Sequence, residues 1–142
     1  FTREFYSQLN KQAIIIDVRH NNGGNIDSWI LTQLMRRPWA WFQSRAGYPS
    51  PNMQFSFGGH LVILVDERSA SDGEAVADGF RRLGLGATIG VRTWGGEVWL
   101  SGSNRQVDNG VTRASETGVF ADGEWLIEGW GFVPDIEVDN PP

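Results

Sequence analysis

The segment LVILVDERSASDGE, residues 61–74, is the strongest indication of fold class in this sequence. Its first five residues, Leu61–Val65, have the composition of a buried strand, and a turn of small and polar residues follows directly. Ser71 and Glu74 then open a helical pattern that runs to Leu83. Because a helix start leaves its first backbone N–H groups without partners, Ser71 is expected beside donors that favour negative charge.

This placement of Ser71 supports two interpretations. A serine beside free N–H donors can attack a carbonyl carbon, and the donors stabilise the resulting oxyanion, as acyl transfer requires. Serine is also a common helix N-cap, and Ser71 with Glu74 three residues later fits a capping box. On this segment alone the capped helix is the more ordinary interpretation.

Strands and helices alternate on both sides of this segment. We expect helices over residues 1–11, 28–37 and 71–83 and strands over 13–18, 60–66 and 87–91. Residues 38–58, rich in aromatics, Pro and Gly, are expected to be irregular, as is the tail from 128. Short strands are expected over 98–100, 111–113, 117–120 and 125–127, with a hairpin turn at Asp122-Gly123. This order predicts one α/β domain, residues 1–142, with a small antiparallel part near the C-terminus.

Composition narrows the classes of function. The net charge is −5 and no basic run exceeds two residues, so a nucleic-acid partner is not expected. Apolar runs of about five residues are too short for membrane insertion. Cysteine is absent and no metal-ligand spacing occurs, so we expect no disulfide, metal or cofactor. The compartment stays open, with the cytoplasm slightly favoured over the periplasm.

A second polar turn, DVRHNNGG at residues 17–24, follows the first strand. The carboxyl ends of parallel strands meet at the sheet edge where ligands bind, so we expect this turn and Ser71 to face one crevice. Gly23 and Gly24 lack Cβ atoms, and their backbone can approach a ligand closely. An N–H of this turn and that of Asp72 would then form a two-donor oxyanion hole. A tight turn that needs positive φ is the alternative reason for the two glycines.

Four motifs taken together resemble the catalytic core of the tricorn proteases and, more broadly, the tail-specific or C-terminal processing serine peptidases. The resemblance implies that Ser71 is the nucleophile and that the Asp72 N–H supplies half of the oxyanion hole, with Gly23 or Gly24 supplying the other half. It implies that Glu128 supports a catalytic histidine through an intervening serine. It also implies the ββα layered fold of the Clp protease and crotonase families. The four motifs cover residues 17–24, 69–74, 90–96 and 128–138.

The general base is where the chain departs from these families. Members with a Ser-Lys pair carry lysine where this chain has Gly96, and the only lysine, Lys11, precedes the first strand. The tricorn group uses a histidine upstream of the matched segment, and neither His20 nor His60 stands in a matching context. We therefore expect an excised core that is inactive or nearly so alone and depends on a histidine outside it.

The expected substrate is a peptide or unfolded protein. A homo-oligomer is also open, because an extracted core can expose apolar surface. Two other functions stay open beside the peptidase. One is a non-catalytic ligand- or peptide-binding module of the same fold, which would use the aromatic-rich segments. The other is a crotonase-like acyl-CoA enzyme, which shares the two-donor oxyanion hole but needs an acidic base and an adenosine pocket.

Overall fold

The computed structural model describes residues 1–100, 106–110 and 115–139. Its largest sheet has four parallel strands in the order β1-β4-β5-β10, which alternate along the chain with helices. The register pairs Ala13 with His60 and Val62 with Ala87, so the strands end at one edge. The α/β class predicted from the alternation is confirmed. The strands are β1 (Ala13–Asp17), β4 (His60–Val65), β5 (Ala87–Gly90) and β10 (Ile136–Glu137), and the helices are α1 (Thr2–Ser7), α2 (Asp27–Leu34) and α3 (Asp72–Arg82).

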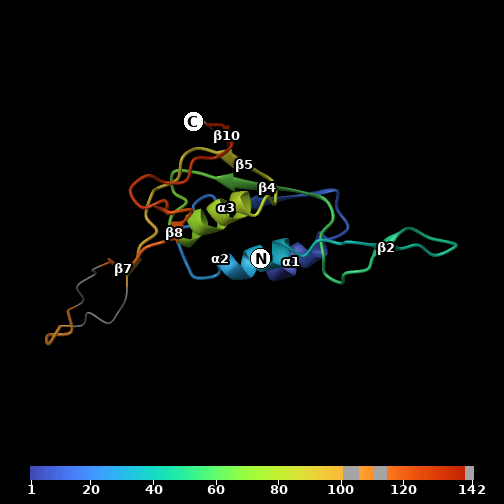
Figure 1. Ribbon diagram of the computed structural model, residues 1–142, viewed down its shortest axis with the longest axis horizontal. Coiled ribbons are helices and arrows are strands. Elements are labelled where there is room, and N and C mark those ends of the chain that lie inside the picture. The colour runs from blue at the N-terminus through green and yellow to red at the C-terminus, as the bar shows by residue number, and fades with distance from the viewer. Residues whose placement is uncertain (101–105, 111–114, 140–142) are drawn as a thin grey trace.

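The helices lie in layers on one face of this sheet. Figure 1 shows α3 directly below β4 and β5, with α1 and α2 beyond it. Ile63 of β4 and Phe80 of α3 are fully buried between the layers. Burying one such side chain stabilises the fold by about 1.5–3 kcal/mol. The spacing of Val76, Phe80 and Leu83 predicts that they share the inward face of α3. Val76 and Phe80 are buried, but Leu83, directly after the helix, is 47% exposed.

The contact between α2 and α3 corrects one prediction. The spacing of Trp29, Ile30 and Leu34 in the sequence predicts that all three point inward. Ile30 and Leu34 are buried, as is Leu31, but Trp29 is 63% exposed. The inward face is set by Gly79 of α3, where an added Cβ would lie 2.5 Å from Leu31 Cδ1. The two helices therefore meet at Leu31, which turns Trp29 outward.

Short antiparallel pairs occupy the C-terminal part. Strand β8 (Phe120–Ala121) pairs with β9 (Glu124–Trp125), and the turn residues Asp122 and Gly123 both have positive φ. The hairpin expected at this dipeptide is therefore confirmed. Strand β6 (Trp99–Leu100) pairs with β7 (Ser115–Thr117). The strand expected over residues 111–113 lies outside the described residues.

Two segments expected to be irregular contain strands. In the tail, β10 pairs with β5 through Ile136 and Ile89. In the aromatic-rich segment, β2 (Trp41–Phe42) pairs with β3 (Ser50–Pro51), and Figure 1 shows this hairpin extending away from the helices. Each strand has only two residues, too few for a periodic pattern to be read from the sequence. Within the described ranges, no helix is long and apolar enough to cross a membrane.

Candidate active site

The turn after β1 packs directly against the turn before α3. The Asn21 carbonyl oxygen accepts the Ala70 N–H at 2.8 Å. An added Cβ on Gly23 would lie 3.1 Å from Ser71 Cβ and 3.4 Å from Ser71 Oγ. Because parallel pairing aligns β1 with β4, the structure places Gly23 beside the Ser71 side chain at the edge where both strands end.

Ser71 has an uncommon backbone conformation, with φ 53° and ψ −122°. A residue other than glycine in such a region costs of order 1–3 kcal/mol and persists only where surrounding contacts fix it. Here the Ser71 N–H donates to the Gly96 carbonyl oxygen and to Glu74 Oε2, both at 2.9 Å. A strained serine between a strand and a helix is the arrangement that exposes the nucleophile in α/β-hydrolases.

Glu74 holds this conformation in place. The side chain is fully buried, and its carboxylate accepts four hydrogen bonds. Oε2 accepts the N–H groups of Ser71 and Gly96, both at 2.9 Å, and Oε1 accepts Thr93 Oγ1–H at 2.5 Å and the Gly95 N–H at 2.7 Å. The capping bond expected from Glu74 to Ser71 is therefore present. The same carboxylate also fixes the loop 93–96, which the sequence did not indicate.

Two backbone N–H groups beside Ser71 have no acceptor within the described part of the chain. They belong to Gly24 and to Asp72, the first residue of α3. The Gly23 N–H, in contrast, donates to Asn21 Oδ1 at 3.0 Å. The arrangement thus distinguishes the two glycines that the sequence left equivalent: only the Gly24 N–H is free.

The Asp72 side chain has a structural task of its own. It is 4% exposed, and it accepts the Ile26 N–H at 2.9 Å and the Asp27 N–H at 3.2 Å. Both donors lie at the start of α2, where backbone N–H groups lack partners within the helix. The position of Asp72 at the start of α3 predicts that its carboxylate caps that helix. The structure shows that it caps the neighbouring helix α2 instead.

Glu128 lies on the other side of the same loop. Its Oε2 accepts the Glu97 N–H at 2.8 Å and the Val98 N–H at 3.0 Å. The preceding residue in that loop, Gly96, accepts the Ser71 N–H. Glu128 and Ser71 are thus linked through the loop 95–98, and the described residues show no direct bond between them.

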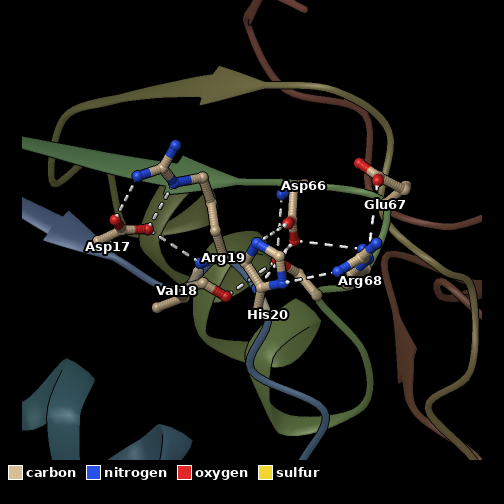
Figure 2. A network of polar contacts seen from close by, with 8 residues as sticks. Asp17, Val18, Arg19, His20, Asp66, Glu67 and Arg68 are labelled. Atoms are coloured by element: carbon tan, nitrogen blue, oxygen red, sulfur yellow. Dashed lines mark hydrogen bonds and ion pairs between the residues drawn. The ribbon is translucent and has the colours of Figure 1, made fainter. Parts of the chain in front are cut away.

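No histidine or lysine side chain bonds Ser71 Oγ within the described residues. His20 Nε2 instead lies 3.2 Å from Asp66 Oδ2, and the His20 N–H donates to Asp66 Oδ1 at 2.9 Å (Figure 2). His60 begins β4 at the strand end opposite Ser71, and Lys11 precedes β1. That the general base is a histidine outside this chain therefore stays a prediction.

The rest of the polar run 17–20 forms an ion-pair network at the sheet edge. The Arg19 guanidinium group donates to Asp17 Oδ1 at 2.9 Å and to Asp17 Oδ2 at 2.7 Å. Figure 2 shows the two side chains facing each other. Burial acts to raise the pKa of Asp66, but hydrogen bonds from His20, Ser69 and Arg68 outweigh it, and the pKa is lowered. The contacts of His20 with Asp66 tie the turn after β1 to the turn after β4, which gives this part of the polar run a structural purpose.

Glu97, which the sequence did not single out, lines a pocket of about 230 Å³ together with Ser71. It is 5% exposed. Burial, followed by the charges of nearby carboxylates, raises its pKa to about 8 from an ordinary 4.5. The only sequence signal is its position after Gly95-Gly96, because the acidic surroundings come from α2 and α3.

The raised pKa makes stability depend on pH. A carboxyl group with a higher pKa in the folded state stabilises the fold fully below its unfolded pKa, and that stability is lost as the pH rises through the folded value. For Glu97 the loss spans pH 4.5 to about 8. We expect Glu97→Gln to melt at a higher temperature than the unaltered chain near pH 9 and at a similar one near pH 4. Melting curves at both pH values test this, and a difference independent of pH would contradict it.

The comparisons with known proteins agree with this geometry. The model of Peptidase family S41 matches residues 1–138. The chain belongs to this family. The tricorn protease of Thermoplasma acidophilum is 34% identical over 143 residues, which cover 100% of this chain and 13% of that protein. The tricorn protease homolog of Saccharolobus solfataricus is 35% identical over 143 residues, again 100% of this chain and 13% of that protein. The S41 chain thus spans only a small part of these relatives.

Solved structures give the same result for the S41 fold. The crystal structure of the tricorn protease superposes with a TM-score of 0.87 at 34% identity, covering 98% of this chain and 14% of that one. The photosystem II D1 C-terminal processing protease has a TM-score of 0.62 at 23% identity, covering 94% and 36%, and shows a shared fold. The resemblance inferred from the four motifs is therefore confirmed at the level of the family.

Proposed function

We propose that this chain is the catalytic core of a serine peptidase of the tricorn and C-terminal processing type, with Ser71 as the nucleophile. The observation that carries the proposal is the strained Ser71 conformation, φ 53°, beside Gly23 at the sheet edge. Strained residues concentrate at active sites, where the strain positions a reacting group. Family membership supports the reaction class. The finer assignment to a ββα layered fold of the Clp protease and crotonase kind belongs to the same proposal.

The proposed chemistry begins when a base removes the Ser71 hydroxyl proton. Ser71 Oγ forms a bond to the peptide carbonyl carbon, and the carbonyl oxygen becomes an oxyanion. The N–H groups of Asp72 and Gly24 donate hydrogen bonds to this oxyanion, and the N-terminus of α3 stabilises its charge further. We prefer Gly24 to Gly23 because the Gly23 N–H is already donated to Asn21. The C–N bond then breaks as the base returns the proton to the amine, and water hydrolyses the acyl-enzyme.

The base in this proposal is a histidine outside the chain. His20 is paired with Asp66, which supports this choice. Glu128 uses Oε2 for the loop 95–98, and its Oε1 has no partner among the described residues. That oxygen would hold the group that orients the histidine. The substrates would be peptides or unfolded proteins, with homo-oligomeric assembly an extension of the proposal.

Labelling the full-length protein with a serine-directed phosphonate tests this function. We expect one covalent adduct, mapped by mass spectrometry to the peptide containing Ser71, and hydrolysis of short peptides that the adduct abolishes. The related binding module would show neither labelling nor hydrolysis. A crotonase-like enzyme would turn over an acyl-CoA and keep its activity without the Ser71 hydroxyl.

Gly23→Ala tests the contact between the two turns. The new Cβ would press against Ser71 Cβ from a backbone with φ 129°. We expect a loss of kcat of about 10²- to 10³-fold, similar to the loss of one oxyanion donor, because the hydroxyl and the oxyanion site would move apart. Gly47→Ala is the matched control, since Gly47 also has positive φ, 113°, but lies in the β2–β3 hairpin. Equal activity losses in both variants would contradict the proposed contact.

A further inference from the structure

One peptide group links the two sides of the candidate active site. The peptide between Gly96 and Glu97 is planar, so its carbonyl and its N–H keep a fixed orientation to each other. The Gly96 carbonyl oxygen accepts the Ser71 N–H at 2.9 Å, and the Glu97 N–H donates to Glu128 Oε2 at 2.8 Å. A rotation of this peptide would therefore break its contacts with both Ser71 and Glu128.

The Glu97 side chain anchors this peptide. It is 5% exposed and lines the pocket of about 230 Å³ that Ser71 also lines. Its Oε2 is buried and has no hydrogen-bond partner among the described residues. Burying a carboxylate without a partner is costly, whereas a neutral acid loses much less. The site therefore suits Glu97 in its protonated form.

The acids that face Glu97 add to this preference. Burial has the largest effect and the charges of nearby carboxylates follow, and together they raise the pKa of Glu97 to about 8. These carboxylates come from both helices that form the pocket. Asp27 belongs to α2, and Asp72, Glu74 and Asp78 belong to α3.

The described residues that line the pocket include one cation, Arg82. Its guanidinium group already binds the carboxylates of Asp78, at 2.5 Å, and of Asp122. An ionised Glu97 would have to compete with both of them for this partner. Since water solvates a carboxylate well, the ionised side chain is stabilised by leaving the pocket, and its departure removes the anchor of the 96–97 peptide.

We propose that Glu97 is a positioning residue of the catalytic centre: its neutral form holds the 96–97 peptide between Ser71 and Glu128, and ionisation releases that peptide. This inference rests on the proposed peptidase function of Ser71. A histidine base must be unprotonated to act, so activity rises with pH on the acid side. Loss of the Glu97 proton then lowers it on the alkaline side, which gives a bell-shaped profile.

The test measures kcat and KM of the full-length protein from about pH 6 to pH 10, with a peptide that has no group titrating in this range. We expect kcat to fall about 10-fold or more between pH 7 and pH 9.5, because a group with a pKa of about 8 is then mostly ionised. Glu97→Gln has a similar shape and cannot ionise, so its kcat should change less than about 3-fold over that interval.

Two further variants separate the anchor from a general effect of charge. Glu97→Ala lacks the anchor at every pH, so its kcat at pH 7 should be about 10-fold below that of Glu97→Gln. Glu67→Gln removes an exposed acid and should keep the full alkaline loss of the unaltered protein. This pattern distinguishes positioning by a neutral side chain from a change in net charge.

Structures of the unaltered full-length protein at pH 7 and at pH 9.5 give a test that needs no variant. We expect the hydrogen bond from the Ser71 N–H to the Gly96 carbonyl to be present at pH 7 and broken at pH 9.5. The pairing of β1 with β4 should be the same in both, which shows that the chain stays folded. An intact bond and a buried Glu97 at pH 9.5 would overturn the proposal.

The kinetic outcomes that would overturn it are equally definite. They are an unaltered protein without the alkaline loss, a Glu97→Gln variant that keeps this loss, and a Glu97→Gln variant as slow at pH 7 as Glu97→Ala. If a phosphonate labels Ser71 and peptides are cleaved in these cases, only the role of Glu97 fails. If Ser71 is not labelled and no peptide is cleaved, the proposed function fails with it.

Discussion

Ser71→Ala is expected to reduce kcat for peptide hydrolysis by the full-length protein about 10⁴- to 10⁶-fold, the loss seen when a serine nucleophile is removed. The variant lacks the oxygen that forms the acyl bond, while the Asp72 and Gly24 N–H groups remain. Substrate binding should change little, so the loss appears in kcat rather than KM. Steady-state kinetics measure it.

Ser71→Gly is the companion variant. Glycine adopts positive φ without steric cost, so it relieves the strain at φ 53°. We expect this variant to be as inactive as Ser71→Ala yet more stable than the unaltered chain by about 1 kcal/mol. Hydrolysis that survives either substitution would contradict the nucleophile assignment, and destabilisation by glycine would contradict the strain.

Glu74→Ala is expected to destabilise the chain by about 4 kcal/mol or more, because it removes an acceptor from four donors in a fully buried site. The N–H groups of Gly95 and Gly96 then have no acceptor among the described residues, while Ser71 and Thr93 keep only their second acceptors. Glu74→Gln keeps the shape of the side chain, but its amide N–H₂ group faces two hydrogen-bond donors. We therefore expect a loss of stability only somewhat smaller than that of Glu74→Ala. Urea denaturation of the chain measures both losses.

Glu67→Ala is the control for this prediction. Glu67 is an exposed acid whose nearest cation, Arg68, lies 4.0 Å away. We expect its removal to change the free energy of unfolding by less than about 0.5 kcal/mol. A Glu74→Ala effect as small as this would show that the loop 93–96 and the helix start do not depend on the buried carboxylate.

The sequence predicted those parts of the molecule whose signals are local. The apolar run before Ser71, the amphipathic stripe of α3 and the Asp122-Gly123 turn each carry a pattern within a few residues. The sequence also predicted that the turn after β1 and the turn before α3 lie close together, because parallel strands end at a common edge of the sheet. Family motifs added the peptidase class, which no local pattern specifies.

The sequence could not predict features that depend on distant contacts. Trp29 points outward because Leu31 of the same helix packs against Gly79 of α3. The Gly23 N–H is occupied, unlike that of Gly24, because the Asn21 side chain is oriented to accept it. The raised pKa of Glu97 arises because the folded chain gathers acids from separate elements. A linear pattern records none of these.

A crystal structure of the full-length protein with a peptidyl phosphonate attached is the most direct test of the central claim, that Ser71 and two backbone donors form a catalytic centre. We predict a bond from phosphorus to Ser71 Oγ and a phosphoryl oxygen about 2.7–3.1 Å from the nitrogens of Asp72 and Gly24. Phosphorus bonded to another residue, or an oxygen directed away from both nitrogens, would contradict it.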